Sequence, residues 1–499
     1  MDVLAELKAQ STQLREASYG SDLVYDQQIR TSVTSLRQVI SDESLGDLAR
    51  SNSLLNNIDP AADSLLYLFL LRFQIRILQK ETRQPLPAAL LPMGEIWPRI
   101  VSYLGSFDSV QSRYVGEEWR QLVELVAHIA QACSQPLVAV RLIRDAMLRL
   151  DPSCIVLTST HLLLVRLCLR ARAYSCALPV LDRYICHFPS SKSRADDASS
   201  PLLCASHDSS LCFITDASGL SSKLTYKDYL QYYLYGGMIY LALKQWTKAV
   251  HFLGIVISMP TTGSVSMIMV EAYKKWILVN LLDKGKVPSP SSLVAPNVVR
   301  VYQSLAKPYV NLAEVFEGGD ISRLEAEIDA AHDVWRADNN LGLVSQVHSA
   351  HTKYTVTNIT KTFAALTVRE LRKQACFSRE TEEATESAIA SLIMSNAISA
   401  TLVHSTDPTK STMVRFTDGR SAARLAHEQE IQVELAREGQ LLRTLSKSMG
   451  DVDYQLGLSN EFIDSLQMSQ GWAVVGESRT GKSEDAGVEI DEDLMGDEA

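Results

Sequence analysis

The sequence predicts a mainly α-helical protein: a solenoid of TPR-like helical repeats, then a small winged-helix subdomain, then further C-terminal helices. Three observations predict this fold class. Glycine (23) and proline (16) are sparse among 499 residues, which favours long helices over a turn-rich β architecture. Apolar residues recur at helical spacing over most of the chain. Two stretches, 161–189 and 233–260, share the pattern of a helical hairpin.

Residues 1–188 are expected to form the first helical repeats. The segment 122–132 (LVELVAHIAQA) places apolar side chains on one helical stripe. The most apolar run, LLYLFLL (65–71), has seven residues and is followed by Arg72 and Arg76. Because a bilayer span needs about 20 apolar residues, this run is predicted to be a buried helix.

The two hairpin-like stretches place residues of the same kinds in the same order. Small residues would let two helices approach, a large apolar residue would fill the space between them, and proline would close the unit. The first copy has Leu164, Val165, Cys168, Ala177, Leu181 and Pro189; the second has Tyr233, Gly236, Gly237, Tyr240, Ala249, Leu253 and Pro260. Such hairpins bury their faces by stacking, which predicts a solenoid.

Residues 189–222 interrupt the helical pattern. They hold 11 serines in 34 positions, so we expect a flexible surface insertion in which Phe213 and Ile214 dock weakly. Helices resume at 223, and 223–352 is predicted to form the helical part of a second domain that ends at 419.

Residues 353–419 are predicted to be a winged helix. A helix is expected to begin at TKTFAAL (360–366), and the next helix has a capping box formed by Thr367 and Glu370. A third helix follows, and the alternating segments 398–404 and 412–416 then predict a two-stranded ribbon.

The C-terminal region is expected to contain amphipathic helices over 420–470 and an acidic, disordered tail over 471–499. Residues 477–499 carry a net charge of −7, so the other 476 residues carry only −3. A balance so close to neutral argues against a basic surface for nucleic acid. The helix over 420–449 has an apolar stripe made of Ile431, Leu435, Leu442, Leu445 and Met449.

Two motifs raise enzymatic alternatives. GESRTGKS (476–483) matches the phosphate-loop pattern, which would make the chain an ATPase. Acidic residues surround the motif and no parallel sheet is predicted to hold it, so the reading is disfavoured. His348 and His351 could share a helix face as metal ligands, but no third ligand accompanies them. The sequence therefore predicts no catalytic residue, no metal site and no cofactor.

Six ordered blocks resemble the PCI-domain family of scaffold subunits, most closely its third-subunit branch in the COP9 signalosome. They span most of 135–416, and each is a run of the sequence: QPLVAVRLIRDAM, LTSTHLLLVRLCLRARAYSCALPVLD, YYLYGGMIYLALKQWTKAV, MVEAYKKWILVNLL, DNNLGLV and ITKTFAALTV. The resemblance implies a non-catalytic subunit that supports removal of a ubiquitin-like modifier from cullin-RING ubiquitin ligases (deneddylation). A scaffold of the proteasome lid or of a translation-initiation factor is the alternative.

The resemblance also implies partners and a mode of assembly. A hetero-oligomer is expected with other PCI-domain subunits and a metalloprotease-type subunit, and indirectly with cullin-RING ligases, but not with nucleic acid or a membrane. A free strand edge and the apolar stripe would be the contact surfaces. The candidate interface residues are Ile398, Leu402, Met413, Val414, Phe416, Ile431, Leu435, Leu442, Leu445 and Met449. With no secretory signal recognised, we expect the cytoplasm and nucleus.

Overall fold

The structure is a computed structural model of the full chain. It describes residues 2–17, 21–41, 55–56, 58–189, 202–205, 210–260, 265–290, 294–374, 381–395, 398–404, 411–416 and 422–458. The chain divides into two compact units, Met1–Gly419 and Arg420–Ala499, and each is described by itself. The predicted mainly helical fold class is confirmed.

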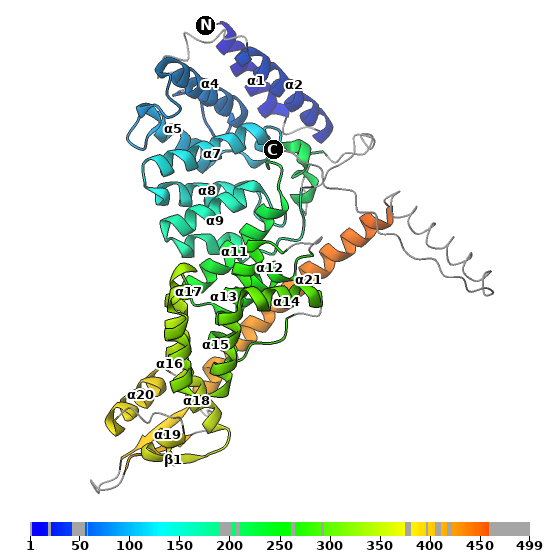
Figure 1. The fold of residues 1–499 in the computed structure, drawn as a ribbon. Coiled ribbons are helices and arrows are strands. Elements are labelled where there is room, and N and C mark those ends of the chain that lie inside the picture. Colours follow the sequence, from blue (N-terminus) through cyan, green and yellow to red (C-terminus); the bar gives the residue numbers. More distant parts are fainter. Residues whose placement is uncertain are drawn as a thin grey trace, which may run out of the picture. The chain divides into compact units, whose positions relative to one another are not determined.

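The first unit begins with helices that pack in successive layers (Figure 1). They are α1 (Asp2–Ala17), α2 (Asp22–Ser41), α4 (Ser64–Thr82), α5 (Trp97–Ser106), α6 (Ser109–Arg113), α7 (Gly116–Ala132) and α8 (Pro136–Leu150). The LLYLFLL run lies in α4, where Leu68, Leu70 and Leu71 are fully buried. The prediction of a buried helix is therefore confirmed, because a helix that is apolar on all sides must be covered on all sides.

The second hairpin-like stretch forms the predicted helical pair. It consists of α11 (Tyr226–Ala242) and α12 (Trp246–Ser258), which pack against each other, and α11 also packs on α9 (Ser159–Ala171). A Cβ atom added at Gly236 would lie 2.7 Å from the ring of Phe252, so only glycine allows the observed approach. The predicted role of small residues at this position is confirmed.

The first hairpin-like stretch departs from the prediction in its second half. After α9 there is only η2 (Tyr174–Ala177) and one turn of helix, α10 (Leu178–Leu181). The chain then pairs with the segment before α9: Cys186 N–H donates to Ile155 O at 2.9 Å, and Leu157 N–H donates to His187 O at 3.0 Å. The expected second helix is wrong here because these extended backbone groups bond to a neighbouring segment.

The end of the serine-rich stretch is part of the core. Residues 210–222 include η4 (Ser210–Cys212) and η5 (Asp216–Ser218). Phe213, Ile214 and Leu220 are only 4%, 2% and 1% exposed. The expectation of a flexible insertion is wrong for this part, because three buried apolar anchors hold it against the solenoid. Most of the remaining serine-rich stretch lies outside the described residues.

A network of polar side chains connects the turn at 338–340, before the last helix of the solenoid, to two earlier helices. Lys274 Nζ lies 2.8 Å from Asp338 Oδ2, which also accepts a hydrogen bond from the Tyr309 hydroxyl at 2.8 Å. Lys275 Nζ donates to Asn340 Oδ1 at 2.9 Å, and Asn340 Nδ2 donates to the Tyr309 hydroxyl at 2.8 Å. The helices involved here and nearby are α13 (Met267–Lys284), α14 (Pro296–Leu305), α15 (Lys307–Gly318), α16 (Ile321–Ala330), α17 (His332–Ala337) and α18 (Leu341–Thr360).

A small α/β module follows α18. It consists of β1 (Ala365–Thr367), α19 (Val368–Gln374), α20 (Glu382–Met394), β2 (Ala400–Val403) and β3 (Met413–Phe416). The predicted strands near 398–404 and 412–416 are confirmed as β2 and β3. The helix predicted to begin at TKTFAAL is wrong, because α18 ends at Thr360, a turn follows, and residues 365–367 form β1. The capping box is confirmed: Thr367 N–H donates to Glu370 Oε2 at 3.1 Å, and Glu370 N–H donates to Thr367 Oγ1 at 3.2 Å.

The second unit contains one long helix, α21 (Ala422–Leu458), with 37 residues. At 1.5 Å per residue it is roughly 55 Å long. The shorter helix expected after it and the acidic tail lie outside the described residues. Among the helices that the structure does describe, none combines the length and apolarity needed to cross a bilayer.

Candidate subunit interfaces

The three strands form an antiparallel sheet in the order β1-β3-β2. β3 therefore has a neighbour on both sides, so the segment 412–416, which supplied three of the candidate interface residues, has no open backbone edge. In the part of the module that is described, β2 pairs only with β3 and leaves its other side unpaired. Of the two strands of the predicted ribbon, β2 is therefore the one with an open edge.

The hydrogen-bond pattern identifies which backbone groups of β2 point to the open edge. Phe416 N–H donates to Ala364 O at 2.9 Å, so the backbone groups of Phe416 point to β1, and those of the preceding residue, Arg415, point to β2. Arg415 lies opposite Thr401, which makes this a hydrogen-bonded pair of the antiparallel ladder. Successive residues of a strand direct their backbone groups to opposite sides. The N–H and C=O of Thr401 therefore point to β3, and those of Leu402 point to the open edge. A strand from another chain could bond there.

Most of the predicted interface side chains of the sheet face its core. Val414 is fully buried and Ile398 is 6% exposed, so neither lines a surface. Leu402 and Phe416 are half-buried and pack against the same cluster. Met413 alone among them is exposed, at 45%. The prediction of Ile398 and Val414 as surface contacts is wrong, because Val414 points to the core face of β3 and Ile398, which precedes β2, is buried in the same cluster.

Val403 is an exposed apolar residue that the sequence prediction missed. It is 51% exposed and lies directly opposite Met413 in the β2–β3 register. The two side chains form an apolar pair on the outer face of the sheet. Alternation along the strand carried the signal. Because the Leu402 side chain faces the core, the side chain of its neighbour Val403 must face away from the core.

The apolar stripe of α21 is exposed within its unit. Ile431 is 42% exposed, and Leu435, Leu442 and Met449 are 65–66% exposed, whereas Leu445 is half-buried. A row of large apolar side chains in this state favours association, because covering them removes apolar surface from water.

The spacing of this stripe is that of a coiled coil. The five residues are separated by 4, 7, 3 and 4 positions, and the same series continues at Val452 and Leu456. Alternating steps of 3 and 4 give a period of 3.5 residues, which keeps the stripe facing a partner helix in a left-handed supercoil. Glu438 divides the step of 7 into 3 and 4, and it is the one charged residue at these positions.

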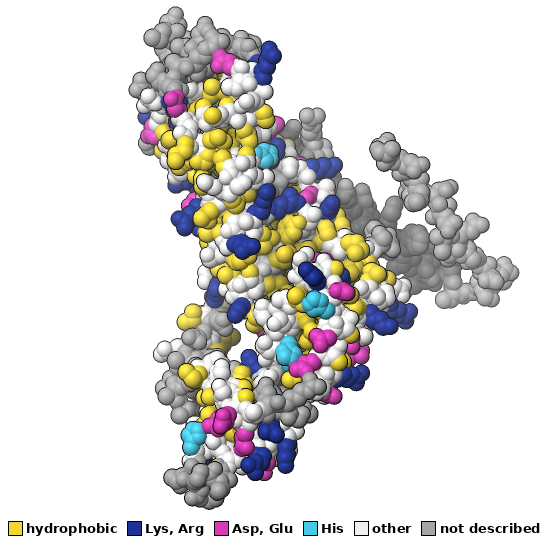
Figure 2. Space-filling view, turned by 60° about the vertical axis from the view of Figure 1, so that its left-hand side comes forward, with side chains coloured by type: hydrophobic (Ala, Val, Ile, Leu, Met, Phe, Trp, Pro, Cys, Tyr) yellow, Lys and Arg dark blue, Asp and Glu magenta, His cyan; other side chains and the backbone are white. Residues whose placement is uncertain are grey.

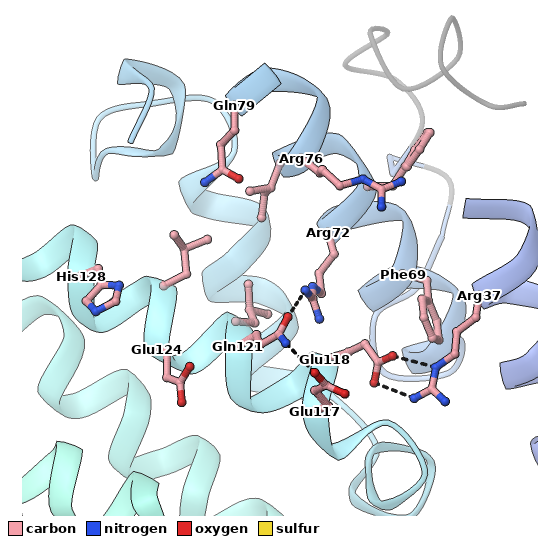
Figure 3. Close-up of a pocket in the computed structure, with 14 residues that line it drawn as sticks. Arg37, Phe69, Arg72, Arg76, Gln79, Glu117, Glu118, Gln121, Glu124 and His128 are labelled. Atoms are coloured by element: carbon pink, nitrogen blue, oxygen red, sulfur yellow. Dashed lines mark hydrogen bonds and ion pairs between the residues drawn. The ribbon is translucent and has the colours of Figure 1, made fainter. Parts of the chain in front are cut away.

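A groove of about 620 Å³ lies between α4 and α7 in the first unit. Figure 3 shows Arg72 and Arg76 on α4 and Glu117 and Gln121 on α7, and the lining also includes apolar side chains from both helices. Arg72 donates to Gln121, and Gln121 Nε2 donates to Glu117 Oε1 at 2.9 Å. Burial lowers the pKa of Arg72.

Several charged side chains of this groove already make ion pairs with other residues of the chain. Arg37 of α2 makes an ion pair with Glu118 at 2.8 Å, and Glu124 pairs at 2.7 Å with Arg120, which is not part of the lining. The residues that line the groove include no serine, threonine, cysteine or lysine, and its ionisable side chains are three arginines, three glutamates and His128.

The two histidines weighed as metal ligands have other surroundings. His351 is 2% exposed, and its ring packs edge-on to Phe316 with centroids 5.1 Å apart. Burial lowers its pKa, and His348 beside it acts in the same direction. His348 Nε2 lies 3.5 Å from Glu325 Oε1. Across the described ranges, no three His, Cys, Asp or Glu side chains are grouped as a metal site would require. The motif 476–483 lies outside them.

These observations define a class: a helical-repeat protein with a terminal α/β module and a long helix that bears an exposed coiled-coil stripe. The family model for the N-terminal helical repeats of COP9 signalosome complex subunit 3 matches residues 30–299. The chain is 44% identical to the COP9 signalosome complex subunit 3 of Emericella nidulans, over 99% of both chains. It is 23% identical to the protein of that name from Neurospora crassa, over 88% of this chain and 87% of the relative. The chain belongs to the COP9 signalosome subunit 3 family.

Proposed function

We propose that this chain is a non-catalytic scaffold subunit of the COP9 signalosome. In that role it supports removal of a ubiquitin-like modifier from cullin-RING ubiquitin ligases by a separate metalloprotease-type subunit. The observation that carries the proposal is the 44% identity over the full length of a relative with that subunit name. We also propose that it acts in the cytoplasm and nucleus, which fluorescence microscopy of a tagged chain would test.

We propose that the α/β module is a winged helix and that its open edge recruits a neighbouring PCI-domain subunit. The outward backbone groups of Leu402 supply hydrogen bonds to an added strand. The apolar pair of Val403 and Met413 lies beside that edge. The charge distribution agrees with a protein partner: on the face in Figure 2, basic side chains are scattered among other kinds and do not form one stripe.

Lysine substitutions on the outer face of β2 test the edge. Thr401 and Val403 are both exposed, so the pair Thr401→Lys and Val403→Lys adds charge without entering the module's core. Lysine blunts edge strands against pairing, so less of the neighbouring subunit should co-purify. Thr247→Lys on α12 is the matched control, since Thr247 is also exposed and should leave assembly unchanged. Unchanged co-purification of the β2 variant would reject the edge.

We propose that α21 joins a bundle of helices from other subunits through its coiled-coil stripe. Leu442→Glu places a charge in the stripe, whereas Thr444→Glu places the same charge on an exposed position off it. Only the first should reduce incorporation into the reconstituted complex. The alternative is that α21 packs on this chain's own solenoid. In that case Leu442→Glu would lower the melting temperature of the isolated chain and leave incorporation unchanged.

The other readings differ in what they predict for the complex. Mass spectrometry of proteins that co-purify with the chain distinguishes the signalosome from the proteasome lid and the initiation factor. A chain truncated after residue 470 lacks the phosphate-loop pattern at 476–483. If the truncated chain assembles and the complex still removes the modifier, an ATPase function of that motif is rejected. Loss of activity with intact assembly would instead contradict a purely structural role.

A further inference from the structure

A small cavity lies where four segments of the first unit meet. Its volume is about 20 Å³, and it is bordered by Trp119 of α7, Asp151 after α8, His161 of α9, and Ile214 and Leu220 of the segment 210–222. The cavity belongs to neither the sheet edge nor the coiled-coil stripe. Its lining mixes apolar walls with the hydroxyls of Thr158 and Thr160, which hydrogen-bond to each other, and with three further polar side chains, those of Trp119, Asp151 and His161.

Each of the three polar side chains has one buried atom without a partner. Trp119 is 1% exposed, Asp151 5% and His161 3%. Among the described residues, no hydrogen bond reaches Trp119 Nε1, Asp151 Oδ2 or His161 Nε2. Native proteins rarely leave buried polar atoms in this state, and ordered water is a common partner for them.

The protonation of His161 follows from its neighbour Thr158. The Thr158 backbone N–H donates to His161 Nδ1 at 3.2 Å. A backbone amide can only donate, so Nδ1 is unprotonated and the neutral ring carries its proton on Nε2. Burial lowers the pKa of His161 to about 4, which keeps the ring neutral near pH 7. The unpartnered Nε2 is therefore a donor.

The other two atoms have fixed roles. An indole nitrogen only donates, so Trp119 Nε1 is a second donor. The carboxylate of Asp151 only accepts. Its other oxygen, Oδ1, already accepts from the Ser153 N–H at 3.0 Å and from the Ser153 hydroxyl at 2.6 Å. The three unpartnered atoms are therefore two donors and one acceptor.

We propose that this cavity binds one ordered water molecule, which accepts from Trp119 Nε1–H and His161 Nε2–H and donates to Asp151 Oδ2. A water has two acceptor and two donor positions, so it satisfies all three atoms at once. The volume is sufficient, since one water needs about 10–15 Å³ by this measure. A metal cation fits poorly, because the two N–H groups would direct their positive ends at it.

The water site is closed by the segment that the sequence predicted to be flexible. Ser159 N–H donates to Ser221 Oγ at 3.0 Å, and Ser153 Oγ lies 3.3 Å from Ser210 Oγ. These bonds tie both ends of 210–222 to the segments that hold Asp151 and His161. The water would therefore join α7, α9 and the turn after α8 beneath a cover supplied by 210–222.

The test is a crystal structure of the full chain, alone or in its complex, at a resolution that shows ordered waters and with anomalous data. We expect a single electron-density peak about 2.7–3.2 Å from all three polar atoms, without anomalous signal. Three results would overturn the proposal. They are an empty cavity with the side chains in place, direct pairing of these atoms with one another, or an anomalous peak about 2.0–2.2 Å from His161 or Asp151.

A variant pair provides a second test. Trp119→Phe removes one donor and keeps an aromatic ring, so the peak should weaken or disappear. Trp335→Phe is the matched control, because Trp335 Nε1 donates to Ile328 O at 3.1 Å and is remote in sequence from the cavity. The peak should keep its full height in that variant. If Trp119→Phe fails to fold, the wild-type structure still decides the question.

Discussion

Gly236→Ala tests whether close helix contact, and not helix propensity, controls the α11–α12 hairpin. In the interior of an exposed helix, this change stabilises by about 1 kcal/mol, because glycine has the greater conformational freedom when unfolded. At Gly236 the new Cβ would lie 2.7 Å from Phe252 Cδ1 and 3.2 Å from Leu181 Cδ2. Carbon atoms prefer about 3.5–4.0 Å, so these neighbours must move.

The surroundings limit that movement. The Phe252 ring lies between Tyr233 and Tyr240, with centroid distances of 5.3 Å and 5.0 Å, and both tyrosines are buried. Overpacking of this kind costs about 1–3 kcal/mol. The cost exceeds the gain in helix propensity, so we expect a net destabilisation of about 1 kcal/mol. Gly254→Ala on α12 is the matched control, because nothing lies within 4 Å of its added Cβ.

Hydrogen exchange of peptides from α11 and α12 measures the local opening free energy. The control should stabilise by about 0.5–1 kcal/mol, which places the two variants about 2 kcal/mol apart. This difference corresponds to a roughly thirtyfold difference in the open population. If Gly236→Ala protects the hairpin as well as Gly254→Ala does, the helices are not in close contact there and the packing argument fails.

Three further changes probe two buried polar groups and one helix cap. Lys275→Met leaves the buried Asn340 Oδ1 without its charged donor, so it should cost about 1.5–3 kcal/mol in denaturant unfolding. The pKa of His161 is lowered from 6.5 to about 4, so the unfolded chain binds more protons between these values. Stability should be fully present above pH 6.5 and fall by roughly 3 kcal/mol on acidification through that window. His161→Gln should remove this part of the pH dependence. Thr367→Ala removes the α19 capping box with Glu370 and should cost about 1 kcal/mol in thermal unfolding, with no effect if the cap is not formed.

The elements predicted correctly from sequence are those whose signal is local. The LLYLFLL helix, the Thr367–Glu370 cap and the two strands β2 and β3 each show their pattern within a few residues. β1 was missed because it has three residues, begins with alanine, and exists only through pairing with β3 about 50 positions later. A strand that depends on a distant partner leaves little trace in its own composition.

Residues 210–222 were misread for a related reason. Their serine content is typical of a flexible loop, yet Phe213, Ile214 and Leu220 are buried and Ser221 satisfies a backbone N–H of α9. Average composition predicted the wrong state because a few well-placed anchors outweigh many polar neighbours. The candidate interface was misread where both faces of a strand are apolar, since Val414 and Met413 are equally apolar and face opposite ways.

The blocks that carry the family resemblance stabilise the fold of the chain, whereas the surfaces proposed for assembly would contact other subunits. The block that contains Lys274 and Lys275 and the block that contains Asp338 and Asn340 lie more than 60 positions apart, yet they meet in one buried network. Their joint presence therefore indicates a shared fold. In the assembly proposed above, partner choice would depend instead on outward groups such as Val403, whose burial the chain's own fold does not require. A substitution in the network should lower stability before assembly, and one on the outer face of β2 should lower assembly at unchanged stability.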